Sequence, residues 1–186
     1  MRKNKFMIYS TLIFIFLQII IGLLLFKNKQ YMYIYEVLAT TIFFIIYTFI
    51  EVKYNLHLSN YTRFFIILTI LAHTFIGDFL NLYVKSFIFD KVLHAVGTYS
   101  FTLLSYSLIN QTIKKDYLEK PRDFIFILCL GVTLGVFFEF IEFTIDIVLK
   151  PQVPSQGNVI DTNMDMIFNT VGAIIAALHR TLFRNS

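Results

Sequence analysis

The sequence predicts an all-α membrane protein, a single domain in which six transmembrane helices form a bundle. Composition is the first reason: 57% of the 186 residues are hydrophobic, only 15% are charged, and the mean hydropathy is +0.69. Soluble domains carry about 25% charged residues, so a soluble domain of this composition would lack polar surface. The second reason is the presence of six apolar segments of roughly 20 residues, the length that crosses a bilayer core about 30 Å thick.

Each expected span is a mostly apolar run. The first contains no charged residue, and the second contains one acid, Glu36, near its start. The third is interrupted by His73, Asp78 and Asn81. Because the runs do not alternate with polar residues, a β-barrel is excluded. The six ranges are 7–26, 31–50, 64–84, 91–109, 124–149 and 162–183.

The last three spans carry polar residues near one end. His94 lies near the start of the fourth span, and Asp165 and Asn169 lie in the first two turns of the sixth. Pro151 follows the fifth span, which it ends because proline cannot continue a helix. The single cysteine, Cys129, excludes a disulfide framework and a cysteine-rich zinc site.

The distribution of Lys and Arg predicts the orientation, because cytoplasmic loops are enriched in these residues. With six spans both termini share a side, and that side carries 11 cations against 5 on the other. We therefore expect a multi-pass protein of the inner or plasma membrane with cytoplasmic termini. Membrane lipids are the expected partners, and anionic headgroups account for the basic charge without nucleic acid. The 11 cations are Arg2, Lys3, Lys5, Lys53, Arg63, Lys114, Lys115, Lys120, Arg122, Arg180 and Arg184.

Acidic residues collect on the outer side of this topology. Glu139, Glu142 and Asp146 are spaced i, i+3 and i+7 and form one stripe on the fifth span. Asp90 and His94, four residues apart, share a face of the fourth span. These spacings predict that the side chains point toward a common region.

Two other spans contribute at the same depth. Asp161, Asp165 and Asn169 are spaced by four residues, so their directions drift only about 40° per step along the sixth span. Asp78 and Asn81 lie near the outer end of the third span. We therefore expect four helices to bring ionisable residues to one polar site.

A carboxylate in a membrane is costly unless it faces protein, water or a cation. Crowded carboxylates with one or two imidazoles suit Mg²⁺, Mn²⁺ or Zn²⁺, so a divalent metal is the expected cofactor. We assign catalytic roles to His94, Asp90 and Glu142. The expected metal ligands are Glu139, Glu142, Asp146, Asp161 and Asp165, and the expected substrate-binding residues are Asp78, Asn81, Lys91 and Asn169.

Each of these residues also has a purely structural interpretation. Asp161 or Thr162 is suited to cap the sixth helix, and Asp90 to cap the fourth. The acids of the fifth span are suited to hydrogen bonds between helices. A lone buried histidine such as His73 is more often a packed core residue than a ligand.

Three motifs stand out in the last three spans: Asp90-Lys91-Val92-Leu93-His94, Glu139-x-x-Glu142 with Asp146, and Ser155-Gln156-Gly157-x-x-x-Asp161-Thr162-x-x-Asp165-Met166 ending in Gly172-Ala173. These motifs resemble the YjdF-like family of bacterial integral membrane proteins, with a looser similarity to VanZ-like proteins. The family pattern often has an acid after the Gln-Gly pair, where this chain has Asn158. The resemblance covers residues 89–177 and implies a multi-span bacterial inner-membrane protein, without implying a particular reaction.

Three functions are compatible with these observations. The first is an enzyme whose cation-assisted site acts on a lipid or isoprenoid phosphate headgroup near the outer leaflet. The second is a small proton- or cation-coupled transporter, in which a homo-oligomer would supply the walls that six spans lack. The third is a non-catalytic membrane partner protein.

Overall fold

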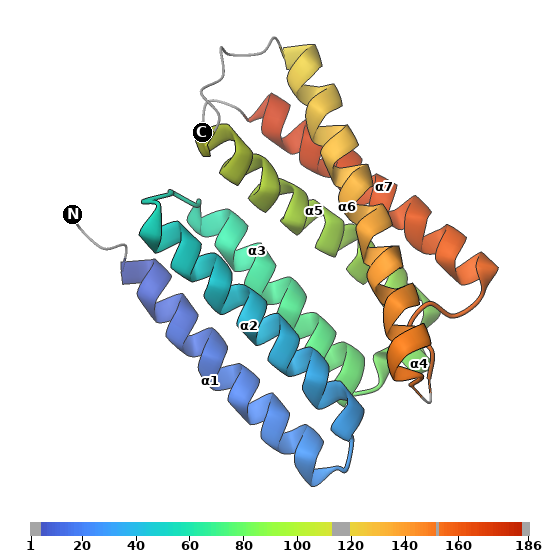
Figure 1. Ribbon diagram of the computed structural model, residues 1–186. Helices are drawn as coiled ribbons and strands as arrows, with labels where there is room; N and C mark the ends of the chain where they lie inside the picture. Colours follow the sequence, from blue (N-terminus) through green and yellow to red (C-terminus); the bar gives the residue numbers. More distant parts are fainter. Residues whose placement is uncertain (1–4, 113–119, 152, 184–186) are drawn as a thin grey trace. The chain divides into compact units, whose positions relative to one another are not determined.

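The computed structural model describes residues 5–112, 120–151 and 153–183, and the regular secondary structure in these ranges is all helical (Figure 1). The predicted all-α membrane architecture is confirmed. Contacts within the chain group it into two compact units, Met1–Ser86 and Phe87–Ser186, which are described separately. Five of the cations that predict the orientation lie outside the described residues: Arg2, Lys3, Lys114, Lys115 and Arg184.

The first unit is built on two long helices, α1 (Lys5–Lys27) and α2 (Tyr31–Lys53). Phe14 of α1 and Phe44 of α2 are fully buried, with ring centroids 4.3 Å apart. Their apolar contact is one of the contacts that hold the two helices side by side. The unit continues through α3 (Asn60–Leu71), the π-helix η1 (Ala72–Phe79) and the single turn α4 (Leu82–Lys85).

The third expected span, 64–84, differs from the single α-helix that its hydropathy predicts. The helix begins earlier, because the Ser59 side chain accepts a hydrogen bond from the Thr62 backbone and caps α3. It then widens into η1, and Asn81 adopts a left-handed conformation with φ of 58°. That conformation is incompatible with a continuing right-handed helix, so the chain turns before α4.

A buried ion pair ties α2 to α3. Arg63 is 1% exposed and pairs with Glu51, which also accepts a hydrogen bond of 2.9 Å from the Tyr47 hydroxyl. Arg63 further donates to Thr11 of α1 at 3.1 Å. Arg63 therefore holds three helices together. From the sequence alone, Arg63 is counted only as a cytoplasmic cation, and this role is not predicted.

The second unit consists of α5 (Phe87–Thr112), α6 (Lys120–Leu149) and α7 (Val159–Leu182). Small residues allow these helices to approach closely. A methyl group at Gly131 would lie 2.5 Å from the Ala173 side chain, and one at Gly135 would lie 2.7 Å from Asn169. Gly172 of α7 lies against the backbone carbonyl of Ala95 in α5.

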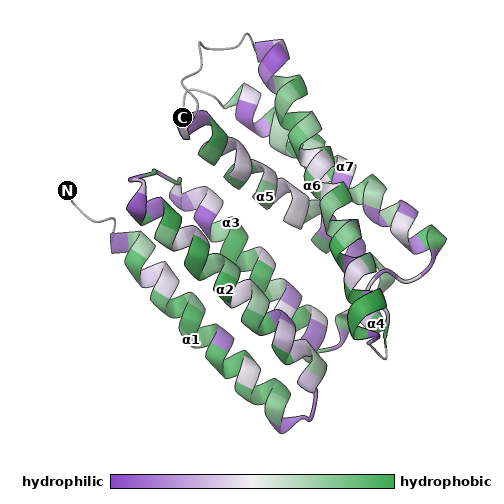
Figure 2. Ribbon diagram, in the orientation of Figure 1, coloured by the Kyte–Doolittle hydropathy of each residue, from purple (hydrophilic) through white to green (hydrophobic). Residues whose placement is uncertain are grey.

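Among the described residues, five helical segments are long and apolar enough to cross a membrane: α1, α2, α3 with η1, α5 and α6. The sixth expected span corresponds to α7, whose 24 residues extend about 36 Å. α7 is not among the five, because polar residues interrupt its apolar run, and Figure 2 shows hydrophilic and hydrophobic residues alternating along it. These polar residues include the ones that build the site described next.

Candidate functional site

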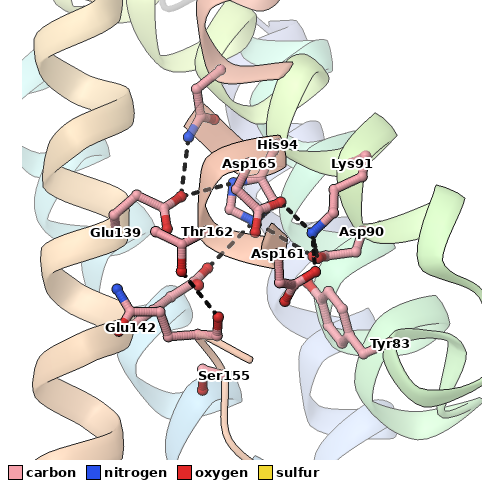
Figure 3. Close-up of polar contacts among 12 residues, drawn as sticks. Tyr83, Asp90, Lys91, His94, Glu139, Glu142, Ser155, Asp161, Thr162 and Asp165 are labelled. Atoms are coloured by element: carbon pink, nitrogen blue, oxygen red, sulfur yellow. Dashed lines mark hydrogen bonds and ion pairs between the residues drawn. The ribbon is translucent and has the colours of Figure 1, made fainter. Parts of the chain in front are cut away.

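The ammonium of Lys91 lies at the centre of an acidic cluster between α5 and α7 (Figure 3). Its Nζ is 2.8 Å from Asp90 Oδ2, 2.5 Å from Asp161 Oδ1 and 2.7 Å from Asp165 Oδ1. The side chains of Lys91 and Asp165 are each 1% exposed. The lysine therefore uses its three donors on three carboxylates, and it acts as an internal counter-ion.

His94, one turn after Asp90 on α5, faces carboxylates from both neighbouring helices. Its Nε2 lies 3.4 Å from an oxygen of each of Asp90, Glu142 and Asp165. Its Nδ1 lies 3.7 Å from Glu139 Oε1. One imidazole thus joins acids of α5, α6 and α7.

Several carboxylate oxygens in this cluster have no hydrogen-bond donor among the described residues. They are Oδ2 of Asp165, Oε2 of Glu139 and Oε2 of Glu142, and all three atoms are buried. Leaving a buried acceptor unsatisfied costs about 1–3 kcal/mol, and more when it is charged. The five acids of the cluster thus exceed the donors that Lys91 and His94 supply.

Asn169 links the acids to the helix scaffold. Its side-chain oxygen accepts a 2.6 Å hydrogen bond from Thr98 of α5, and its amide donates to Glu139 Oε1 at 3.3 Å. Asn169 packs on Gly135, where a side chain would displace it. This arrangement orients Glu139 toward His94.

Around His94, two groups of three described residues have the geometry to hold a metal ion. Asp90, His94 and Asp165 form one group, and His94, Glu139 and Glu142 form the other, with the ligand atoms of each group within 4.8 Å of one another. In a tetrahedral site with bonds of about 2.0 Å, ligand atoms are about 3.3 Å apart. The three distances of 3.4 Å from His94 Nε2 are close to that value.

Of the eleven side chains assigned to the site, eight lie together in the second unit. Asp146 is on the same helix as Glu139 and Glu142, but its two oxygens accept hydrogen bonds from the backbone of Ser155 at 2.7 Å and Gln156 at 3.0 Å. It lies outside both groups of three. The eight are Asp90, Lys91, His94, Glu139, Glu142, Asp161, Asp165 and Asn169.

The remaining two predicted residues, Asp78 and Asn81, belong to the first unit. Asp78 lies 3.9 Å from His73 Nε2, and the side-chain oxygen of Asn81 accepts a hydrogen bond from Gln30 at 3.4 Å. Glu36 approaches the same His73 nitrogen at 3.1 Å. The pairing of Glu36 with His73 joins α2 to η1, and sequence spacing within one helix does not predict it.

Asp161 and Asp90 do not cap α7 and α5, in contrast to their purely structural interpretation. The cap of α7 is Asn158, whose side chain accepts hydrogen bonds from the backbone of Ile160 and Asp161. Asp161 instead binds Lys91, and Asp90 lies within the first turn of α5, which begins at Phe87. Asn158 three residues before an acid is an N-cap signal that the sequence does contain.

Comparison with known proteins identifies a family and an uncharacterised relative. A family model described as "Predicted membrane protein (DUF2238)" matches residues 8–186. An uncharacterised protein from Thermotoga maritima is 33% identical over 116 residues, which cover 62% of this chain and 59% of the relative. The chain therefore spans less than two thirds of that relative's length. No solved structure matches the chain.

Proposed function

We propose that this chain, which belongs to the family of predicted membrane proteins DUF2238, is a multi-pass protein of a bacterial cell membrane. We further propose that it binds a divalent cation between α5, α6 and α7. The resemblance to the YjdF-like family is compatible with this membership. In the proposed topology both termini are cytoplasmic, and the acidic cluster lies near the outer leaflet.

The observation that carries the proposal is the set of buried carboxylate oxygens around His94 that have no donor among the described residues. A charged group in the membrane interior is costly unless it is paired. A divalent cation bound by His94, Glu139 and Glu142, with Asp90 or Asp165 as a further ligand, would satisfy these oxygens. Asp161 already accepts a hydrogen bond from Lys91, so Asp161 contributes to the cluster by binding the lysine.

The ligand types favour Zn²⁺ or Mn²⁺ over Mg²⁺, because imidazole is a softer ligand than oxygen. Such an ion would polarise a phosphate oxygen and neutralise its charge. We infer that the substrate is the phosphate headgroup of a lipid or isoprenoid, since an ion at this depth is reached from the membrane.

A second candidate is a small cation- or proton-coupled transporter. It is favoured by the same carboxylates, because oxygens without donors can accept protons as well as a metal. The two candidates differ in whether metal is retained or moved. A non-catalytic partner protein, possible for any membrane bundle, predicts neither metal binding nor transport.

The test measures metal bound to the purified full chain in mild detergent, after equilibration with Mn²⁺ or Zn²⁺ and gel filtration. We expect Glu139→Gln and Asp165→Asn each to lose one equivalent of metal relative to the wild type. Asp146→Asn is the matched control on α6, because Asp146 binds loop backbone, and it should retain that equivalent.

Equal metal content in the wild type and in both folded variants would overturn the metal proposal. In proteoliposomes, release of phosphate from a lipid or isoprenoid phosphate that is lost in Glu139→Gln supports the enzyme. Metal or proton uptake lost in the same variant, without phosphate release, supports the transporter instead.

A further inference from the structure

Another group of side chains that could hold a metal ion lies in the first unit and plays no part in the proposed function. His73 Nε2 is 3.1 Å from Glu36 Oε2 and 3.9 Å from Asp78 Oδ2. One ligand atom from each of these three residues lies within 4.8 Å of the other two. The group joins α2 to the π-helix η1.

The π-helix brings His73 and Asp78 to one side of the chain. Residues five apart in an α-helix point about 140° away from each other, at 100° per residue. In a π-helix, hydrogen bonds connect residues i and i+5, so these residues lie almost above one another. Ala72–Phe79 is π-helical, and this accounts for two ligands that α-helical spacing would separate.

Tyr83 holds the imidazole of His73 from the opposite side. The Tyr83 hydroxyl and His73 Nδ1 share a hydrogen bond of 2.5 Å. The tyrosine ring occupies the space beside Gly77, where any side chain would collide with it. With Nδ1 engaged by Tyr83, Nε2 is the nitrogen turned toward Glu36 and Asp78, and metal-binding histidines are commonly oriented in this way.

The burial of Asp78 is an independent indication that a cation binds at this group. Asp78 is 1% exposed, and its Oδ2 has no hydrogen-bond donor among the described residues. Glu51 in the same unit shows the contrast, because its buried Oε2 is satisfied by Arg63 and by the Tyr47 hydroxyl. The burial of Asp78 without such a partner is costly unless a cation binds it.

We propose that Glu36, His73 and Asp78 form a second divalent-cation site that binds Zn²⁺, with Tyr83 as the residue that orients His73. One imidazole and two carboxylates are ligands that Zn²⁺ accepts, and three protein ligands leave a coordination position for water. The distances of 3.1 and 3.9 Å lie on either side of the roughly 3.3 Å between ligand atoms in a tetrahedral zinc site. The site does not depend on the cluster around His94.

The experiment titrates the purified full chain in detergent with Zn²⁺ against a chromogenic chelator, and Co²⁺ absorption spectra report the coordination. We expect Glu36→Gln and Asp78→Asn each to lose one equivalent of Zn²⁺. His57→Ala, a histidine of the same unit outside the group, should lose none. Tyr83→Phe should keep the stoichiometry and weaken the affinity about 10- to 100-fold.

The two proposed sites are separated by combining variants. If both are correct, Glu139→Gln and Asp78→Asn each remove one equivalent and the double variant removes both. If only the site at His94 exists, Asp78→Asn binds as much Zn²⁺ as the wild type, and the second site is rejected. Thermal unfolding confirms that each variant is folded, and Glu36→Gln provides the result if Asp78→Asn does not fold.

Discussion

The ammonium of Lys91 and the carboxylate of Asp165 lie 2.7 Å apart, and both side chains are 99% removed from solvent. Removing one partner of such a buried pair leaves an uncompensated charge. The pair belongs to a network in which Asp90 and Asp161 also bind the lysine. Lys91 is therefore expected to determine the stability of the second unit.

Replacing Lys91 with methionine keeps the apolar stem and removes the charge. We expect Lys91→Met to lower the free energy of unfolding by about 3–5 kcal/mol, because three carboxylates lose their counter-ion. Unfolding of the detergent-solubilised chain measures this loss. The exposed Lys27→Met is the control and should change stability by no more than about 0.5 kcal/mol. In the double variant, Asp165→Asn should restore part of the unfolding free energy that Lys91→Met loses. If the losses of the two single variants simply add up in the double variant, the pairing is contradicted.

Gly135 tests the close contact between α6 and α7. A methyl group there would lie 2.7 Å from the Asn169 side chain, so Gly135→Ala should destabilise the chain by about 1–3 kcal/mol. Gly22→Ala is the matched control, since its nearest neighbour would be 4.0 Å away. Alanine favours helix by up to about 1 kcal/mol there, so the control should unfold at the same or a higher temperature. Equal melting temperatures of both variants would contradict the packing.

Thr98 tests the orientation of Asn169. Thr98→Val removes the donor of the 2.6 Å hydrogen bond and leaves the Asn169 oxygen without it, which should cost about 1–3 kcal/mol. Thr133→Val is the control, because Thr133 is exposed and donates to the Cys129 carbonyl of its own helix. Metal titration of both variants should show weaker binding in Thr98→Val alone. Unchanged affinity would mean that Asn169 does not orient Glu139.

Asn158 tests the start of α7. Asn158→Ala removes the acceptor for the backbone of Ile160 and Asp161, and it should cost about 0.5–2 kcal/mol. Asn158→Asp retains the acceptor and adds a negative charge at the helix N-terminus, which is favourable. Its stability should therefore match or exceed that of the wild type. An aspartate variant as unstable as the alanine variant would show that capping is not the cause.

Helical periodicity predicts a large part of the candidate site. Asp161 and Asp165 are four residues apart, and both reach Lys91. Glu139 and Glu142 are three apart, and both face His94. These relations follow from spacing along single helices, which the sequence contains directly.

Relations that depend on the path of the chain could not be predicted in this way. Asp146 continues the stripe of Glu139 and Glu142, but there the loop folds back and its backbone N–H groups bind the carboxylate. Asp78 pairs with His73 because η1 is a π-helix, and hydropathy does not distinguish π- from α-helix. α7 is too polar to be recognised as a membrane span from its hydropathy. Such a helix is expected where its polar residues face protein.

The contact between Gly172 and the Ala95 carbonyl has a consequence for the proposed metal site. Main-chain atoms of Ala95 thus limit how closely α7 approaches α5, and these two helices carry Asp165 and His94. Zinc bonds to oxygen are about 2.0–2.2 Å long, whereas calcium bonds are about 2.3–2.6 Å. We expect a bulkier residue at Gly172 to push the two helices apart, which in the proposed metal site would favour the larger ion over the smaller one.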